Sequence, residues 1–307
     1  MTLLNEQAKG VFTIAVTPFF PNGAVDFDSI DRMVDFYIEK GATGLTILGL
    51  MGEAGTLTAG ESVAITARVT HRATVPVVVG VSAPGLAALH ALAQTAMENG
   101  AAGVMVAPGP GLKTDDQIVG YFQLITETLG QDIPWVLQDF PLVTGVHMAP
   151  AVCLRIFETC PTCVMLKHED WPGLDKISTL RRAQAEGARR VSILCGNGGV
   201  FLIEELQRGA DGAMTGFAFP EMMADVVTAY QMGHKTRARD IFDAYTPMIR
   251  YENQPGLGLL IRKYTLAKRG AIAHPTVRRP APILSPNTKA EIDALIVRQT
   301  ARLATLG

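Results

Sequence analysis

The sequence has few cysteines, few charged side chains and no long apolar run, and each shortage excludes a class of protein. Four cysteines among 307 residues are too few for a disulfide framework, which favours a reducing, cytoplasmic setting. Charged residues make up only 18% of the chain and the net charge is −2, so we expect neither nucleic acid nor a membrane surface as a partner. No apolar run approaches the roughly 18 residues of a membrane span, and the first residues lack the form of a signal peptide. These features predict a soluble, globular, cytoplasmic protein.

Residues that bind metals are also scarce and scattered. The six histidines show no ligand spacing, so we expect no metal site and no cofactor. Cys160 and Cys163 form a CxxC, a pattern found in zinc sites and in redox pairs. No second CxxC and no HxxxH supplies further ligands. We therefore interpret the two cysteines as small residues at a junction between a helix and a strand.

Short apolar runs with helical patterns between them dominate the chain instead. The runs are rich in Val, Ile and Leu and mostly lack apolar/polar alternation, which is typical of parallel strands buried on both faces. A capping box at Thr58–Glu61 predicts the start of one intervening helix. Gly41, Gly100, Gly187 and Gly209 each stand between a helix and the next strand, where a left-handed cap is favourable. The eight predicted strands cover residues 11–16, 44–48, 76–81, 103–106, 134–137, 163–166, 191–194 and 212–215.

Eight strand–helix alternations predict an eight-stranded parallel (β/α)8 TIM barrel, whose usual size is about 250 residues. The rival is a doubly wound open sheet, which normally has a glycine-rich phosphate turn after its first strand. The stretch AVTPFF at that point is nothing like one. We expect residues 1–220 to form the barrel and residues 221–307 to form a C-terminal helical extension packed on it as a single structural unit. The helices of this extension are predicted at 222–233, 236–251, 256–269 and 287–303.

One stretch, VMLKHED from Val164 to Asp170, joins an apolar strand core to four ionisable residues without a turn. In a TIM barrel the active site lies at the carboxyl ends of the strands, and Lys167 ends the sixth predicted strand. A poorly hydrated amine above the barrel core can form a Schiff base with a carbonyl substrate. The alternative is an ion pair that only closes the barrel mouth. Alternation assigns Cys163, Met165, Lys167 and Glu169 to one face of the strand, and Val164, Leu166 and His168 to the other.

The ends of the other predicted strands carry a matching set of short motifs. In order and spacing, over almost the whole chain, this set resembles the dihydrodipicolinate synthase/N-acetylneuraminate lyase family. The resemblance implies a TIM barrel, commonly a homotetramer, that binds pyruvate or another 2-keto acid as a Schiff base without a metal. The residue that matches the family's lysine is Lys167. The motifs are Thr17-Pro18-Phe19, Gly49-Leu50-Met51-Gly52-Glu53, Gln138-Asp139-Phe140-Pro141-Leu142-Val143-Thr144-Gly145, Gly196-Asn197-Gly198-Gly199 and Thr215-Gly216.

Three departures from the family pattern fall in one pocket. The family's Gly-Thr-Thr-Gly-Glu loop has Leu50 and Met51 in place of its hydroxyl residues, so only backbone N–H groups remain to bind the keto-acid carboxylate. Gln138 replaces the tyrosine that relays protons beside the lysine, and glutamine has no ionisable proton. Val143 stands where dihydrodipicolinate synthases hold the carboxylate of their second substrate with an arginine. These departures speak against synthase activity.

Glu169 is our candidate for the missing proton relay. It lies two residues beyond Lys167, so it can reach the same side of the barrel mouth, where an apolar surrounding favours proton transfer near neutral pH. An ordinary ion-pair role for Glu169 is the alternative, and a bound water or Asp139 would then move the proton. Lys-x-Glu, together with Gln-Asp, GAMTG and RYENQ, resembles the branch of the family that contains L-2-keto-3-deoxyarabonate dehydratase.

These residues and the resemblance predict a lyase that dehydrates a 2-keto-3-deoxy sugar acid through a Schiff base on Lys167. Loss of the tyrosine favours elimination, because an aldolase must deprotonate the C4 hydroxyl. The alternatives are a 2-keto acid aldolase, a synthase-like condensation and a non-catalytic barrel that binds keto acids. The absence of clustered ligands disfavours a metal-dependent class II aldolase. From the resemblance we also expect a homo-oligomer, formed as a dimer of dimers.

Other candidate residues surround the lysine. We expect the backbone N–H groups of Met51 and Gly52 to bind the carboxylate of the substrate. Glu53 is expected to fix its own loop, and His168 to be packed or exposed rather than catalytic. The stretch from Arg250 to Asn253 fits either a helix surface or an interface. The residues expected to bind the substrate are Gly49, Leu50, Met51, Gly52, Phe140, Asn197, Gly198 and Thr215.

Overall fold

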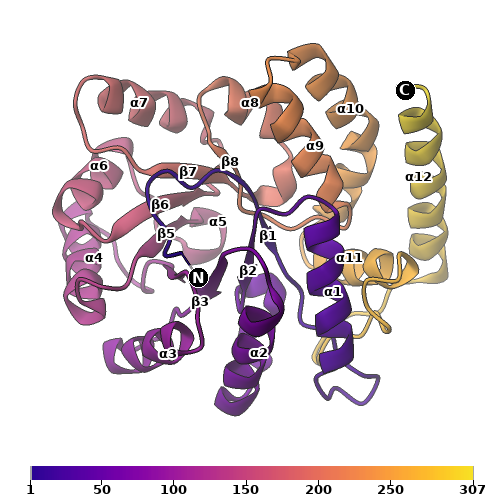
Figure 1. Cartoon of the computed structure of the whole chain (residues 1–307), viewed down its shortest axis with the longest axis horizontal. Coiled ribbons are helices and arrows are strands. Elements are labelled where there is room, and N and C mark those ends of the chain that lie inside the picture. The colour runs from indigo at the N-terminus through magenta and orange to yellow at the C-terminus, as the bar shows by residue number, and fades with distance from the viewer. Residues whose placement is uncertain (1, 307) are drawn as a thin grey trace.

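The computed structural model describes residues 2–306 and contains a closed barrel of parallel strands. Each strand pairs with its neighbours in the sequence, and β8 pairs with β1, so the sheet has no free edge (Figure 1). The predicted (β/α)8 fold is confirmed. The strands are β1 (Gly10–Ile14), β2 (Gly44–Ile47), β3 (Val77–Gly80), β4 (Gly103–Val106), β5 (Trp135–Asp139), β6 (Cys163–His168), β7 (Ser192–Cys195) and β8 (Gly212–Ala213).

Helices connect the strands and cover the outside of the barrel (Figure 1). Three short 3-10 helices, η1 (Leu50–Gly52), η2 (Ala54–Thr56) and η3 (Asn197–Gly199), lie in the loops after β2 and β7. The α-helices are α1 (Phe27–Glu39), α2 (Ala59–Arg72), α3 (Leu86–Glu98), α4 (Asp115–Leu129), α5 (Pro141–Thr144), α6 (Pro150–Thr159), α7 (Leu174–Ala185), α8 (Leu202–Gln207), α9 (Pro220–Gln231), α10 (Lys235–Glu252), α11 (Gly258–Lys268) and α12 (Pro286–Ala304).

The strands separate two apolar cores. Side chains such as Phe12, Val78 and Met105 fill the barrel itself. Leu4 belongs to the same cluster, and its N–H bonds to Ala102 at the amino end of β4, so the N-terminal segment closes that end of the barrel. The larger core lies between the strands and the helices. Because apolar side chains fill the barrel and the N-terminal segment closes its amino end, polar side chains have room at the carboxyl ends of the strands.

Strand β6 does not alternate along its whole length. A register shift against β5 inserts one extra residue, so Cys163 belongs to the outer core while Val164 and Met165 both belong to the inner one. The predicted faces of Cys163 and Val164 are therefore wrong, because alternation assumes a regular ladder and a β-bulge breaks it. Leu166 packs in the outer core as predicted.

Local sequence signals fix the loops as predicted. The Thr58 side chain accepts from the Glu61 N–H and the Glu61 carboxylate accepts from the Thr58 N–H, which completes the capping box of α2. The glycines expected to follow helices all have positive φ, a conformation that side chains with a Cβ rarely adopt. They are Gly41 (89°), Gly100 (88°), Gly187 (110°) and Gly209 (95°).

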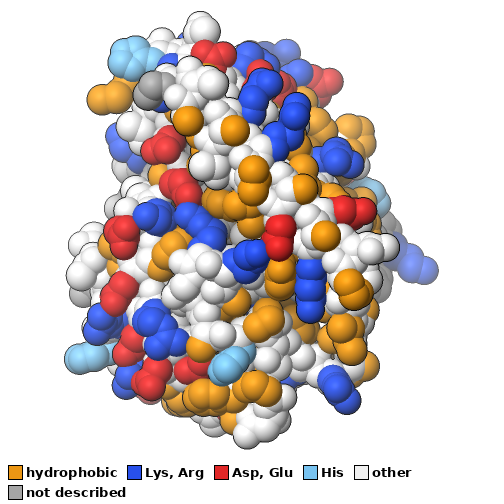
Figure 2. Space-filling view, turned by 90° about the vertical axis from the view of Figure 1, so that its right-hand side faces the viewer, with side chains coloured by type: hydrophobic (Ala, Val, Ile, Leu, Met, Phe, Trp, Pro, Cys, Tyr) orange, Lys and Arg blue, Asp and Glu red, His pale blue; other side chains and the backbone are white. Residues whose placement is uncertain are grey.

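The C-terminal helices lie along one side of the barrel (Figure 1). Helix α9 packs against β1 and β8, so it is the helix that follows β8 in the barrel ring. The expected division after residue 220 counts this helix with the C-terminal extension. Helix α10 packs against α9, and both α11 and α12 pack against α10. Figure 2 shows acidic and basic side chains interspersed on this face, with hydrophobic side chains between them.

The expectations about membrane spans and about the CxxC can be compared with the structure. Within residues 2–306, no helix is long and apolar enough to cross a membrane. Cys160 and Cys163 are buried free thiols. Burial raises the pKa of the Cys163 thiol well above its usual range, which disfavours the thiolate that metal binding and redox chemistry require.

Candidate active site

Lys167 lies near the carboxyl end of β6, beside Gln138 of β5 and Leu194 of β7 in the sheet register. The strand continues for one residue beyond it, to His168. The residue is 5% exposed, so its amine is almost removed from water. Its neighbour Met165 belongs to the core inside the barrel, and so Lys167, two residues later, faces the barrel mouth.

Glu169 joins this lysine and Gln138 into one group, through an ion pair to Lys167 and a hydrogen bond from Gln138. The Oε2 atom of Glu169 lies 2.9 Å from Lys167 Nζ and accepts a hydrogen bond of 2.8 Å from Gln138 Nε2. All three side chains are buried. The residues predicted to be catalytic therefore meet at one carboxylate oxygen. Their catalytic roles stay a prediction.

A glycine makes room for the Glu169 side chain. A Cβ atom at Gly196 would lie 2.2 Å from Glu169 Cγ, well inside any normal contact. The N–H of Glu169 donates to Asp139 O, and the N–H of Gly196 donates to His168 O, so the sheet hydrogen bonds continue past the strand ends. Glu169 is thus held beside Lys167 by the backbone and by the absence of a side chain at position 196.

The next residue of β5, Asp139, faces the opposite way. Its Oδ2 atom lies 2.7 Å from Lys176 Nζ, and Asp170 Oδ2 lies at the same distance from that amine. Burial alone would lower the pKa of Lys176, but the Asp139 charge and the hydrogen bonds to both carboxylates outweigh it and raise that pKa. Burial raises the pKa of Asp139 against the opposing charge of Lys176. This arrangement occupies Asp139 in an ion pair with α7 and turns it away from Lys167.

His168 also points away from the mouth, as predicted, and is buried. Its Nδ1 atom lies 3.7 Å from Glu205 Oε1. Together with Cys195 these residues place three possible metal ligands within 4.8 Å of one another, a cluster that sequence spacing did not reveal. Burial raises the pKa of Glu205 and that of Cys195, which disfavours their charged forms. The cluster lies between the strands and α8, so it does not contact a substrate at the mouth.

The loop after β2 offers backbone donors to a carboxylate. Among residues 2–306, no acceptor bonds the N–H groups of Leu50 and Met51, the first residues of η1. The Gly52 N–H already donates to Gly49 O at 3.0 Å, so it is less available than predicted. The Met51 side chain packs on the core inside the barrel, and Leu50 is exposed. From the other side, the Thr17 hydroxyl holds Gly52 O at 2.6 Å.

The loops after β7 and β8 hold each other. Asn197 Nδ2 donates to Glu169 O at 3.1 Å, and the Gly198 N–H donates to Thr215 Oγ1 at 2.8 Å. Asn197 and Gly198 have positive φ values of 51° and 66°. The polar groups predicted to line the pocket are thus partly occupied in fixing these loops around Glu169.

The loop after β5 brings no charge to the mouth. Half-buried Phe140 precedes α5, and its carbonyl caps the backbone of Val143 and Thr144. Leu142 and Val143 are exposed, at 63% and 55%. At this position, where a second carboxylate would need a cation, the chain presents only apolar side chains.

Two buried ion pairs near the mouth escaped sequence analysis. Glu53 pairs with Lys263 of α11, and Glu252 pairs with Arg262 at 2.7 Å. Glu252, within the stretch left open between surface and interface, is buried and also accepts from the Ala218 N–H. Burial raises the pKa of Glu252 against the opposing charge of Arg262. The sequence signal for the second pair was weak: Glu252 follows Arg250 on α10, a helix with one buried face.

Comparisons with known proteins show that the chain is similar to the enzymes of one family. Residues 7–299 match the profile of the dihydrodipicolinate synthetase family. The chain is 29% identical over 296 residues to L-2-keto-3-deoxyarabonate dehydratase of Azospirillum brasilense, covering 94% of each chain. It is 27% identical over 306 residues to 4-hydroxy-tetrahydrodipicolinate synthase of Pseudomonas aeruginosa, covering 96% of this chain and 99% of that one. A crystal structure described as dihydrodipicolinate synthase from Rhodopseudomonas palustris superposes with a TM-score of 0.95 at 51% identity, covering 97% of this chain and 100% of that one.

Proposed function

Because the chain belongs to the dihydrodipicolinate synthetase family and is therefore a lyase, we propose that it dehydrates a short 2-keto-3-deoxy sugar acid through a Schiff base on Lys167. The observation that carries this proposal is the group at the barrel mouth. Within residues 2–306, Glu169 is the one carboxylate that pairs with Lys167 Nζ, at 2.9 Å, and Gln138 stands where a phenol would be needed for aldol cleavage.

The reaction begins at the amine of Lys167. The neutral amine attacks the C2 carbonyl carbon, and loss of water gives an iminium ion. The iminium withdraws electrons from C3, so a base can remove a C3 proton and leave an enamine. The enamine electrons then expel the C4 hydroxyl, which leaves as water after receiving a proton. Hydrolysis of the resulting conjugated iminium releases the dehydrated keto acid and restores Lys167.

Glu169 is placed to carry the proton in both directions. As a carboxylate it can take the proton from C3, and as a carboxylic acid it can return it to the leaving hydroxyl. Its contact with Lys167 Nζ puts it next to the bond that becomes the iminium. The Gln138 amide donates to the same oxygen and so orients the carboxylate without titrating itself.

The loop after β2 supplies the site for the carboxylate of the substrate. The N–H groups of Leu50 and Met51 are unbonded within residues 2–306 and can donate to a carboxylate oxygen. Such binding uses the backbone in place of hydroxyl side chains. It suits a substrate anchored by C1 and C2 whose remaining carbons lie towards the exposed rim.

Condensation of pyruvate with aspartate semialdehyde is the second candidate. The similar proteins from Pseudomonas aeruginosa and Rhodopseudomonas palustris are both described as synthases of this kind. Against it stand exposed Val143, which cannot bind a second carboxylate, and Gln138, which cannot relay a proton. Loss of such a charge-assisted contact costs about 2–5 kcal/mol in binding.

Two assays on the purified protein separate the candidates. The proposal predicts consumption of L-2-keto-3-deoxyarabonate with release of a dehydrated 2-keto acid and no pyruvate, followed by chromatography and mass spectrometry. The coupled synthase assay with pyruvate and aspartate semialdehyde should give a negligible rate. Fast synthase turnover without dehydration would reverse the assignment.

We further propose that the chain acts as a cytoplasmic homo-oligomer, a dimer of dimers. Family resemblance supports this proposal. Light scattering on the eluate of a size-exclusion column gives the mass in solution, and four times 32.9 kDa is the expected value.

A further inference from the structure

Glu53 ends the loop proposed to bind the substrate carboxylate, yet its side chain is bonded elsewhere. Its backbone is left-handed, with φ at 55°, and its N–H closes η1 by bonding to Leu50 O at 3.0 Å. Its Oε1 atom contacts Lys263 Nζ, and its Oε2 atom accepts from the Arg278 N–H at 2.9 Å. Both carboxylate oxygens therefore bind residues that follow the barrel. The end of η1 is fixed by the C-terminal extension.

Lys263 is the centre of this contact. It lies on α11 with no exposed surface, and its Nζ also donates to Thr276 O at 2.8 Å. The amine lies 4.5 Å from the centroid of the Phe19 ring, in the loop after β1. Removing two charges from water is costly, and an apolar pair of similar volume is often as stable. A role in holding a loop explains why charges occupy this position.

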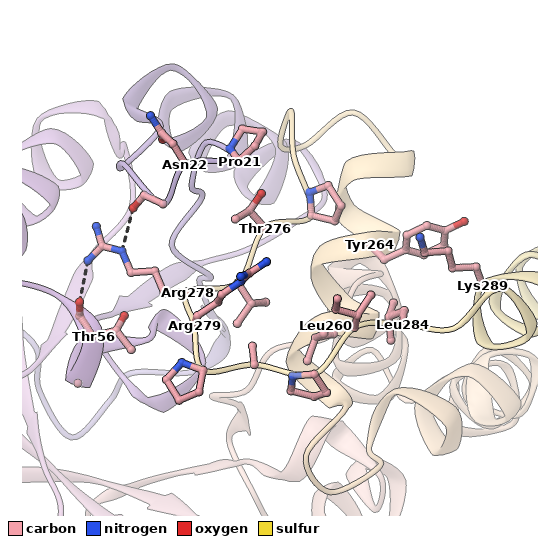
Figure 3. Close-up of a pocket in the computed structure, with 18 residues that line it drawn as sticks. Pro21, Asn22, Thr56, Leu260, Tyr264, Thr276, Arg278, Arg279, Leu284 and Lys289 are labelled. Carbon is pink, nitrogen blue, oxygen red and sulfur yellow. Dashed lines mark hydrogen bonds between the residues drawn. The ribbon is translucent and has the colours of Figure 1, made fainter.

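Arg278 extends the same connection towards the surface. Its guanidinium lies 4.4 Å from the Phe19 ring centroid and pairs with Glu61 of α2. It donates to Gly23 O at 2.9 Å and to Thr56 O at 2.7 Å, so it joins the loops after β1 and β2 (Figure 3). Thr276 and Arg278 also line a cavity of about 1030 Å³, most of whose lining comes from residues 275–284 (Figure 3). Water can therefore approach the connection from its outer side.

We propose that Lys263 is a positioning residue for substrate binding, an inference that rests on the proposed function. Through Glu53 it holds η1 in the conformation that presents the Leu50 and Met51 N–H groups to the keto-acid carboxylate. The C-terminal extension thereby sets the affinity for the substrate without touching it. Lys167 and Glu169 do not contact this connection, so the chemical step is expected to be insensitive to it.

The protonation of Lys263 gives the connection a dependence on pH. Burial lowers its pKa to about 8, the charge of Glu53 opposes this effect, and the charge of Arg278 adds to it. Because the folded pKa lies below the ordinary value of 10.5, raising the pH from about 8 to 10.5 favours the folded state as far as this group is concerned. A neutral amine binds Glu53 less strongly in that range. Substrate affinity should therefore fall at alkaline pH without a matching loss of stability from this group.

The test compares Lys263→Met with Lys268→Met on the same helix. Lys268 forms an exposed pair with Asp293 at 2.7 Å and serves as the control. Pyruvate is the probe, and two readouts are taken: the concentration that gives half-maximal borohydride trapping, and hydrogen exchange of a peptide covering residues 48–58. For Lys263→Met we expect a half-saturating concentration raised roughly ten- to a hundredfold, the range for loss of one charge-assisted hydrogen bond.

At saturating pyruvate the Lys263→Met adduct should still form on Lys167, and the loop peptide should exchange faster. Between pH 8 and pH 10 the affinity of the parent should fall relative to that of Lys263→Met, because the group at position 263 titrates only in the parent. Lys268→Met should match the parent in half-saturating pyruvate, in exchange of the loop peptide and in pH dependence. Parent-like trapping and exchange in Lys263→Met would overturn the inference.

A second variant covers the case in which Lys263→Met does not fold. Glu53→Gln keeps one of the two acceptor oxygens but loses the charge, so we expect a rise in half-saturating pyruvate of roughly fivefold. An unchanged value in Glu53→Gln, with unchanged exchange, contradicts the inference. If the parent itself forms no adduct, the proposed function fails, while exchange of the loop peptide still decides the role of Lys263.

Discussion

A buried lysine faces each side of the sheet at β5 and β6, and the two lysines differ in the number of their carboxylate partners. Towards the barrel mouth, Lys167 has one carboxylate partner, Glu169, which it shares with an amide. Towards the helices, Lys176 has two carboxylate partners, Asp139 and Asp170, each 2.7 Å from its amine. The two lysines are almost equally buried, at 5% and 7%. Burial alone therefore does not distinguish a reactive lysine from a structural one.

The number of carboxylates and access to the mouth make the distinction. Two carboxylates hold the proton on Lys176, because their combined effect exceeds that of burial and raises its pKa. Lys263 shows the converse case, since burial lowers its pKa to about 8 but no part of it is exposed. Only Lys167 among these three combines a single carboxylate partner with a position at the carboxyl end of a barrel strand.

From this comparison we predict that removing Lys167 at the barrel mouth abolishes activity, while removing Lys176 on the helix side destabilises the fold. Lys167→Ala should lower the rate by roughly 10⁴-fold or more, because no other group can replace the covalent nucleophile. Lys176→Met should leave the buried Asp139 carboxylate, and the partly exposed Asp170 beside it, without this cation, and lower the free energy of unfolding by about 3–5 kcal/mol. Turnover assays and denaturant unfolding of both variants measure these effects. Activity loss in folded Lys176→Met with full activity in Lys167→Ala would exchange the two roles.

The next largest effect concerns the shared carboxylate. Glu169→Gln should still form the Schiff base, because Lys167 is untouched. Dehydration should slow by roughly 10²–10⁴-fold, the usual contribution of a positioned acid or base. Adduct mass after trapping and keto-acid product formed per unit time are measured on one preparation. A parent-like rate in this variant would make Glu169 an ion-pair partner and leave a bound water as the proton carrier.

A methyl group at position 196 should displace that carboxylate without removing it. The added Cβ of Gly196→Ala would lie 2.2 Å from Glu169 Cγ, so the side chain must leave its place between Lys167 and Gln138. We expect a rate loss of roughly 10²-fold, as for a misplacement of about 1 Å. Gly120→Ala on α4, where nothing lies within 4 Å of the new atom, is the control and should keep full activity. Equal rates for the two variants would show that the position of Glu169 is not critical.

The smallest effect is expected at the amide. Gln138→Ala removes one hydrogen bond to Glu169 and no titrating proton, so the rate should fall by roughly tenfold. Gln138→Tyr returns the relay expected in the family and should release some pyruvate by cleavage. Steady-state rates and pyruvate release measure the two outcomes. A loss in Gln138→Ala as large as that in Glu169→Gln would give the amide a direct part in the reaction.

The sequence allowed the fold and the centre of the site to be predicted, because both rest on short-range patterns. Buried apolar runs at regular spacing indicated the barrel strands, the end of the sixth strand indicated Lys167 and Glu169, and the resemblance to the family indicated that Gln138 lies beside them. The faces of Cys163 and Val164 could not be predicted, since the β-bulge arises from the pairing of β6 with β5.

Contacts between distant segments were likewise out of reach. The pair of Glu53 with Lys263 joins residues 210 positions apart, and nothing in the local pattern of α11 names its partner. The group of His168, Cys195 and Glu205 is assembled in the same way by three separate elements. Long-range pairing of buried charges depends on tertiary packing, which periodicity does not encode.

Borohydride trapping with pyruvate tests the central claim most directly. The intact protein is treated with pyruvate and borohydride, its mass is measured, and the modified peptide is sequenced by mass spectrometry. We predict one pyruvate-derived addition per chain, on Lys167, in the parent and in Glu169→Gln alike. An adduct on Lys176, or no adduct in an active preparation, would contradict it.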